Sequence, residues 1–146
     1  MSKFKRPLGA VLSEPDKGIY DALNKALKLA NGEIIGLLHS DDVFADNTVI
    51  EAVVDKMVLE NVDGVYGNLV YVAKNNKNKV MRTWISSQFS PEKLHMGWMP
   101  PHPTLFLKES WYNRLGGFDD SYRISADYKF ILQLFSSEGF SVAPLS

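Results

Sequence analysis

Two adjacent acids, Asp41 and Asp42, are the residues whose types and position best suit chemistry. They follow the apolar run 34–38, and carboxylates at the end of a buried strand lie at the mouth of a sheet. Hard divalent cations such as Mg²⁺ or Mn²⁺ take oxygen ligands there and can also bind phosphate. The pair therefore indicates chemistry on a nucleotide-diphosphate substrate. The alternative is that both acids only stabilise the turn before Asp46, because Asp is common in turns.

A third acid, Asp127, is expected in the first turn of a helix over 126–136 with Ser125 as its N-cap. The unpaired N–H groups and the dipole at a helix N-terminus favour an ionised carboxylate, which suits a general base. The same physics fits an acid that only stabilises its helix. From the residues alone, that second interpretation is the default.

His102 lies between two prolines ahead of an apolar run. It can face a phosphate, a metal or an acceptor, or it can simply make a backbone hydrogen bond. His39 is expected to pack at its strand end, and His95 has no supporting context. Three aromatic side chains can stack on a sugar ring but are more often core residues: Trp98, Trp111 and Tyr112.

A polar group straddles a predicted loop and the start of the next helix: Asp16, Lys17, Asp21, Asn24 and Lys25. Lys17 or Lys25 can approach a phosphate, while Asp21 or Asn24 can read a nucleobase or ribose. The default explanation is that most of these side chains form the solvated face of an amphipathic helix.

The elements that must position these groups alternate between helix and strand. Apolar residues repeat at helical spacing over 19–30, and Asn31-Gly32 supplies a stop before the strand 34–38. A second helix is expected to begin after Asp46 or Thr48, with Glu51 completing a capping box, and to end near 60–61. The runs 65–73 and 80–84 predict two strands joined by a polar turn over 74–79.

The segment 89–103 is rich in proline and is expected to cross the surface as irregular structure. The run 104–107 then re-enters the sheet. A short helix over 109–115, a tight turn over 116–119 and the helix over 126–136 complete the expected order.

Composition favours one folded domain over 1–146, because 146 residues with 45% apolar side chains can bury a core. Lys and Arg (16) nearly balance Asp and Glu (17), so no nucleic-acid partner is expected. The chain has no cysteine, which excludes disulfides and thiolate metal sites. No apolar run approaches the ~20 residues needed to span a bilayer, so a cytoplasmic location is expected.

Four motifs follow one another along the chain: Ser-Glu-Pro-Asp-Lys-Gly-Ile-Tyr-Asp-Ala-Leu-Asn-Lys at 13–25, Ser-Asp-Asp at 40–42, Gly-Gly-Phe-Asp at 116–119, and Ser-Ala-Asp-Tyr-Lys-Phe at 125–130. Together they resemble the family 2 glycosyltransferases of the GT-A fold. The resemblance implies an α/β domain with a Rossmann-like sheet flanked by helices. It also implies an inverting transferase that moves a sugar from a nucleotide-sugar to an acceptor hydroxyl.

By this resemblance, Asp127 matches the family's catalytic base. Asp42 matches the acid that binds Mg²⁺ or Mn²⁺ bridging the donor phosphates, and Asp41 would orient the ribose or support the metal. The implied donor is a UDP- or dTDP-sugar. The implied acceptor is a saccharide or a lipid-linked molecule used in cell-surface polysaccharide or glycolipid synthesis, which allows peripheral association with the inner face of the membrane.

Family members begin with further strand–helix units, so the sheet is expected to be incomplete on its N-terminal side, and the C-terminus to be shortened. An alternative follows: a non-catalytic remnant or partner-binding domain, whose exposed sheet edge would favour a homo-oligomer. The transferase hypothesis requires one arrangement in space. The carboxyl groups of Asp42 and Asp127 must converge on a common cleft.

Overall fold

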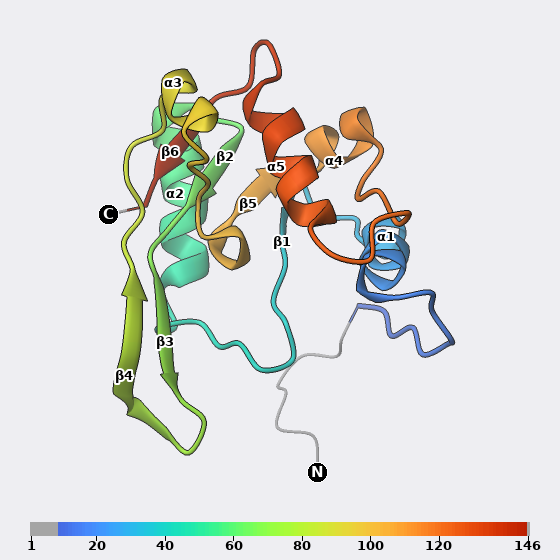
Figure 1. Cartoon of the computed structure of the whole chain (residues 1–146), viewed down its shortest axis with the longest axis horizontal. Helices are drawn as coiled ribbons and strands as arrows, with labels where there is room; N and C mark the ends of the chain where they lie inside the picture. The colour runs from blue at the N-terminus through green and yellow to red at the C-terminus, as the bar shows by residue number, and fades with distance from the viewer. Residues whose placement is uncertain (1–8, 146) are drawn as a thin grey trace.

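The computed structural model describes residues 9–145, which form a four-stranded sheet, helices on both of its faces and a separate hairpin (Figure 1). The predicted α/β class is confirmed. The strands are β1 (Ile34–Gly36), β2 (Gly64–Tyr66), β3 (Leu69–Ala73), β4 (Asn76–Trp84), β5 (Phe106–Lys108) and β6 (Val142–Pro144). The helices are α1 (Ile19–Leu29), α2 (Val49–Glu60), α3 (Pro91–His95), the 3₁₀ turn η1 (His102–Thr104), α4 (Glu109–Leu115) and α5 (Ala126–Phe135). None of the helices in this part of the chain combines the length and apolarity that a membrane crossing requires.

The main sheet has the order β1-β5-β2-β6 and is mixed: β5 runs antiparallel to both neighbours, whereas β6 runs parallel to β2. Gly36 pairs with Phe106, and a Cβ on Gly36 would lie 2.3 Å from that ring. Glycine is therefore required for the close approach of these strands. Strand β1 ends there, two residues before the predicted end at Leu38, because β5 begins opposite it and offers no later partner. Strand β6 was not predicted.

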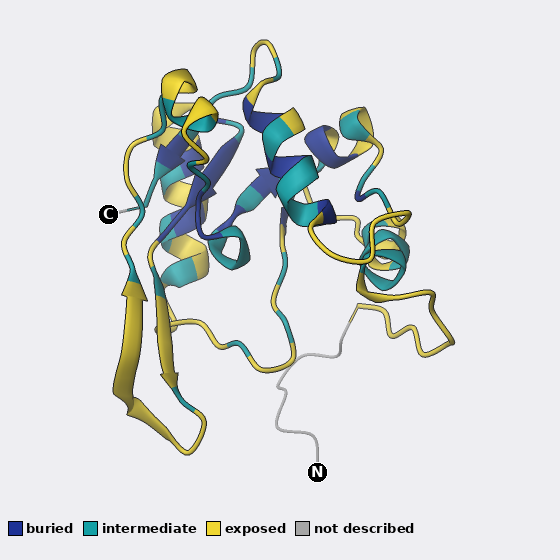
Figure 2. Cartoon of the chain, in the orientation of Figure 1, coloured by how far each residue is buried: buried dark blue, intermediate teal, exposed yellow. Residues whose placement is uncertain are grey.

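Successive residues of each strand pack on opposite faces of the sheet, as the pleat requires. Ile35, Tyr66 and Leu107 belong to a large aromatic core beneath α4 and α5. Their neighbours Ile34, Val65 and Phe106 pack against α2 on the other face. The helices therefore cover both faces, and the buried positions gather along the sheet (Figure 2).

Helix α2 begins and ends where expected, but the predicted capping box is wrong. Thr48 has a helical backbone and donates both its N–H and its hydroxyl to Asp46 Oδ1, at 2.8 and 2.6 Å. The hydroxyl is therefore used by the preceding turn and makes no bond to the helix. At the other end, Asn61 takes the left-handed conformation that terminates a helix.

The run 65–73 is divided between two sheets, which the sequence pattern did not reveal. Gly67 leaves the main sheet because its N–H and C=O both bond to the Thr104 hydroxyl, at 3.0 and 2.9 Å. The expected polar turn over 74–79 is also wrong. Only residues 74 and 75 form the turn, and residues 76–79 continue as β4.

The segment 89–103 lies largely at the surface as predicted, but it is not wholly irregular. It forms α3 and η1, and both Pro100 and Pro101 are fully buried. Phe89 and Trp98 pack against each other and against Phe135 of α5, with ring centroids 4.8–5.7 Å apart. This aromatic cluster draws the segment onto the sheet and places η1 directly before β5.

The turn over 116–119 is held to α1 by one side chain. Asn24 donates its amide to the Phe118 carbonyl (2.7 Å) and accepts the Phe118 N–H (2.8 Å). Gly117 has φ +77°, and a Cβ there would lie 2.6 Å from Asn24 Oδ1, so this position requires glycine. The pair fixes α1 against the segment that leads into α5.

Replacing Asn24 with Ala should destabilise the protein by about 1–3 kcal/mol, because it leaves the backbone N–H and C=O of buried Phe118 without partners. Urea unfolding followed by circular dichroism measures the change. The matched control is Asn113→Ala, which removes an exposed amide bonded only to Glu109 and should change stability by less than about 0.5 kcal/mol. Equal effects of the two substitutions would contradict the structural role of Asn24.

Candidate functional site

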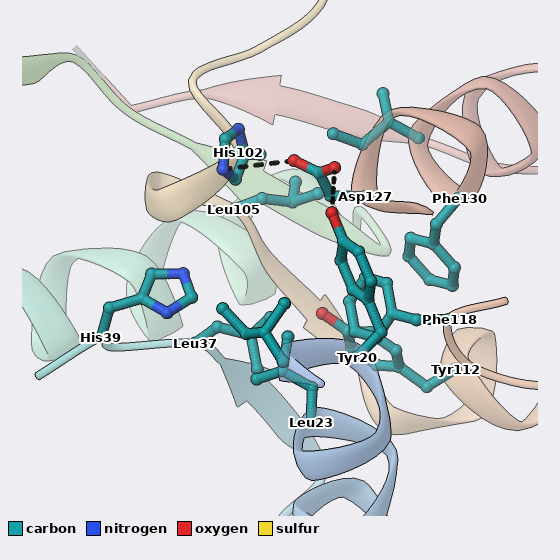
Figure 3. A pocket seen from close by; sticks show the side chains of 12 residues that line it. Tyr20, Leu23, Leu37, His39, His102, Leu105, Tyr112, Phe118, Asp127 and Phe130 are labelled. Atoms are coloured by element: carbon teal, nitrogen blue, oxygen red, sulfur yellow. Dashed lines mark hydrogen bonds and ion pairs between the residues drawn. The ribbon is translucent and has the colours of Figure 1, made fainter. Parts of the chain in front are cut away.

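A cleft of ≈ 560 Å³, open to solvent, lies between α1, α5 and the segments that follow β1 and precede β5 (Figure 3). Its walls are mostly apolar and its polar groups are few. Five lining residues have polar side-chain atoms, and they come from four helical elements and one loop: Tyr20, His39, His102, Tyr112 and Asp127. The remaining lining residues are Ile19, Leu23, Leu37, Leu105, Phe118, Phe130 and Ile131.

Asp127 lies in the first turn of α5, as predicted, and its two carboxylate oxygens face different partners. The Tyr20 hydroxyl donates to Oδ1 at 2.9 Å, and His102 Nε2 lies 3.4 Å from Oδ2 (Figure 3). Ser125 is the N-cap, but its backbone is left-handed (φ 72°) and its hydroxyl makes no capping bond, contrary to expectation. The carboxylate is therefore oriented by side chains from α1 and η1.

His102 is a neutral donor at neutral pH. Its Nδ1 is buried and has no hydrogen-bond partner among residues 9–145, so the single ring proton belongs on Nε2, which faces Asp127. Burial lowers the pKa of His102, and His39 lowers it further, while the carboxylates of Asp127 and Asp42 raise it in part. Burial prevails, so the ring that lies 3.4 Å from the Asp127 carboxylate has a pKa below its usual value.

Tyr20 is also protonated. Burial raises the pKa of its hydroxyl, and the hydrogen bond to Asp127 and the charge of that carboxylate raise it further. The backbone N–H groups of Asp127 and Ala126 oppose this rise only in part. The Tyr20 hydroxyl thus bonds one carboxylate oxygen and the His102 ring lies beside the other. Each oxygen keeps a lone pair for a further proton donor such as an acceptor hydroxyl.

The sheet topology explains why Asp42 acts on the same imidazole as Asp127. Because β5 runs antiparallel to β1 and Gly36 pairs with Phe106, the segment after β1 and the segment before β5 leave the sheet at one end. The first carries His39 and Asp42, and the second carries His102. Both acids of interest therefore lie within electrostatic reach of one ring.

The acid pair sits in a turn in which the Asp42 N–H donates to the His39 carbonyl at 3.1 Å. Asp41 is exposed and Asp42 is half-buried. Within residues 9–145 neither carboxylate accepts a hydrogen bond, and no three His, Asp or Glu side chains gather around one point. This fits Mg²⁺ or Mn²⁺ held by one or two carboxylates together with substrate phosphates, and does not fit a cation caged by protein alone.

Asp41 and Asp42 are not among the residues that line the cleft, and the remaining predicted binding residues from the α1 region also lie outside its lining. Asp21 accepts the Lys17 N–H at 2.9 Å and pairs with Lys25 at 3.0 Å, and Lys25 also pairs with Glu14 at 2.9 Å. The Lys17 N–H and the Lys25 ammonium lower the pKa of Asp21. Asp16 accepts a backbone N–H at the start of α1. This network fixes the loop before α1, and Asn24 is occupied by the Phe118 backbone, so their role in binding a nucleotide stays a prediction.

Sequence reasoning missed Tyr20, although it had a detectable signal. Tyr20, Leu23 and Leu27 occur at helical spacing, which places the tyrosine on the buried stripe of α1. The three aromatic residues considered as sugar-stacking candidates are mainly core residues. Trp111 is buried and Trp98 packs in the aromatic cluster, whereas Tyr112 is buried and also lines the cleft.

Comparisons with known proteins agree with the motifs. Residues 3–124 match the family model described as glycosyl transferase family 2. An uncharacterized glycosyltransferase of Mycobacterium tuberculosis is 31% identical over 83% of this chain and 45% of its own length. A PGL/p-HBAD biosynthesis glycosyltransferase of Mycobacterium bovis is 26% identical over 85% of this chain and 46% of its own length. Chondroitin synthase of Pasteurella multocida is 26% identical over 88% of this chain and 13% of its own length. The chain thus spans less than half the length of these curated relatives.

The His102 titration tests the geometry of the site. Asp42→Asn and Asp127→Asn should each lower the pKa of His102 further below its usual value, because each removes a negative charge that stabilises the imidazolium. NMR of the ring protons against pH measures the midpoint. Asp55→Asn, on the exposed face of α2, is the control with the same charge change and should leave the midpoint in place. An Asp42 variant that behaves like this control would show that Asp42 does not approach the cleft.

Proposed function

The chain belongs to glycosyl transferase family 2, and on that premise we propose that it carries the acceptor side of a glycosyltransferase site. In the proposed reaction a sugar passes from a nucleotide-diphosphate sugar to an acceptor hydroxyl with inversion at the anomeric carbon. The observation that carries the proposal is the carboxylate of Asp127, held at an open cleft by Tyr20 and His102.

Asp127 is the proposed general base. As the acceptor oxygen attacks the anomeric carbon, its proton passes to a free lone pair of the Asp127 carboxylate, and the bond to the nucleoside diphosphate breaks with its electron pair. One displacement at carbon inverts its configuration and needs one base. Tyr20 and His102 touch neither reacting carbon nor leaving group in this scheme, and they act as positioning residues for Asp127.

Asp42, with Asp41 in support, is the proposed holder of Mg²⁺ or Mn²⁺. A cation bound there would supply charge neutralisation for the leaving diphosphate. The support for this role is the half-buried Asp42 carboxylate, which has no hydrogen-bond partner among residues 9–145 and whose charge raises the pKa of His102 in part.

The proposed substrate class is suggested by the motifs and by likeness to the relatives. Two of them are named for PGL/p-HBAD biosynthesis and for chondroitin synthesis. We therefore propose a UDP- or dTDP-sugar as the donor and a saccharide or lipid-linked acceptor, with the reaction at the cytoplasmic face of a membrane. The mostly apolar lining of the cleft is compatible with an acceptor that carries an apolar portion.

Isothermal titration with UDP and Mn²⁺ tests the metal role. The unaltered chain should bind UDP only when Mn²⁺ is present, and Asp42→Ala should weaken that binding at least tenfold because a phosphate-bridging ligand is lost. Asp55→Ala removes the same charge from an exposed site on α2 and should bind like the unaltered chain. Equal heats for all three proteins would remove the proposed site and favour a non-catalytic, partner-binding domain.

Asp127→Asn tests the base. The amide keeps the size of the carboxylate but accepts no proton, so release of UDP from a panel of UDP-sugars with saccharide acceptors should fall about 10²–10⁴-fold. Binding of UDP and Mn²⁺ should stay unchanged, which distinguishes loss of chemistry from loss of the donor site. Undiminished transfer by the Asp127→Asn variant would refute the assignment.

A further inference from the structure

The hairpin formed by β3 and β4 carries a concentration of positive charge that the balanced composition conceals. Between Asp63 and Glu92 the sequence contains four cationic residues and no carboxylate, although the whole chain has a net charge of −1. The cations are Lys74, Lys77, Lys79 and Arg82, and all of them lie in the hairpin. Three lysines surround its tip.

The two faces of the hairpin differ. Tyr71 pairs with Arg82 across the strands, and the guanidinium lies over the Tyr71 and Trp84 rings, 5.7 and 6.0 Å from their centroids. The rings and the guanidinium of this face contact one another, although Tyr71 remains 43% exposed. Residues adjacent to these along the strands point to the opposite face, because the side-chain period of a strand is two.

The second face is aliphatic and uncovered. Val70 pairs with Thr83 and Val72 with Val80, and these three valines are 47%, 39% and 56% exposed. Met81, at the register shift, is 63% exposed and Ile85, at the base, 73% exposed. Figure 2 shows the hairpin as an exposed ribbon that extends away from the main sheet. A two-stranded hairpin is marginally stable in water, and neighbouring exposed aliphatic groups of this kind mark an interaction surface.

We propose that this valine face and its lysine tip form a docking surface for an anionic phospholipid bilayer. Such a surface offers phosphates to the three lysines of the tip and hydrocarbon just below them to the valines, so one partner satisfies both features. A second copy of the hairpin would bring two groups of four positive charges together. A nucleic acid would neutralise the charge but leave the aliphatic face uncovered, and the hairpin's Tyr71 and Trp84 rings already contact Arg82.

Vesicle flotation with the 146-residue chain tests the proposal. The chain should float with vesicles of phosphatidylcholine containing about one third phosphatidylglycerol, and not with pure phosphatidylcholine. Lys74→Gln, Lys77→Gln and Lys79→Gln combined should reduce binding on the order of 100-fold, because each cation near such a surface contributes about fivefold. High salt should also weaken binding of the unaltered chain to the anionic vesicles, because it screens the attraction between the lysines and the lipid phosphates.

Two further variants make the test specific. Lys28→Gln, Lys56→Gln and Lys93→Gln combined make the same change in net charge outside the hairpin and should bind like the unaltered chain. Val70→Thr, Val72→Thr and Val80→Thr combined keep the charge and the strand propensity and should weaken vesicle binding, while leaving binding to a single-stranded oligonucleotide unchanged. Unfolding midpoints check that each variant remains folded.

Several results would overturn the inference. These are no binding to the anionic vesicles, equal binding to the neutral ones, or equal loss in the two lysine triple variants. Vesicle binding unaffected by the valine variant would reduce the surface to a general polyanion site. A dimer in light scattering that the valine variant abolishes would assign the face to self-association. None of these measurements depends on sugar transfer. A failure of the membrane-docking proposal can therefore be distinguished from a failure of the proposed transferase function.

Discussion

The arrangement of this domain depends on one carboxylate, that of Asp127, in a cleft whose walls are mostly apolar. A charge in such surroundings is costly unless it is hydrogen-bonded. Tyr20 donates a hydrogen bond to one oxygen, and His102 Nε2 lies 3.4 Å from the other. Burial raises the pKa of Tyr20 and lowers that of His102, so the charged form of each side chain is disfavoured beside the carboxylate. An oriented, charged and accessible carboxylate is what a proton acceptor requires. The same contacts hold α1, η1 and the start of α5 together.

The mixed sheet makes this arrangement available. Strand β5 runs antiparallel between β1 and β2. The segment that follows β1 and the segment that precedes β5 therefore leave the sheet at the same end. The buried prolines and the aromatic cluster around Trp98 then fix the entry into β5. On the other side, the bonds from Asn24 to Phe118 fix α1 against the approach to α5. The cleft is thus defined by contacts between segments that are distant in the sequence.

The parts of the fold that were predicted correctly from the sequence depend on interactions between residues close together in the chain. The helix over 109–115 and the stop at Asn61 depend on residues within one or two turns, and the structure has both where expected. The errors occurred where a distant partner decided the outcome. Gly67 leaves the sheet because Thr104 bonds it, and Pro100 and Pro101 are buried in a segment that Phe89 and Trp98 hold against α5. The Thr48 hydroxyl was a local error, because Asp46 competes for it within the same turn.

The sequence by itself determined the family motifs, the acids at 41, 42 and 127, and a hairpin segment with cations and no carboxylate. It also determined the helices α1, α2, α4 and α5, because helical periodicity and stop signals are local properties. Only the tertiary structure decided that Tyr20 bonds Asp127 across 107 residues and that Asp42 acts on the imidazole beside it. Both relations depend on strand direction and on packing across the sheet. No short stretch of the sequence determines strand direction or packing, because both arise from contacts between distant segments.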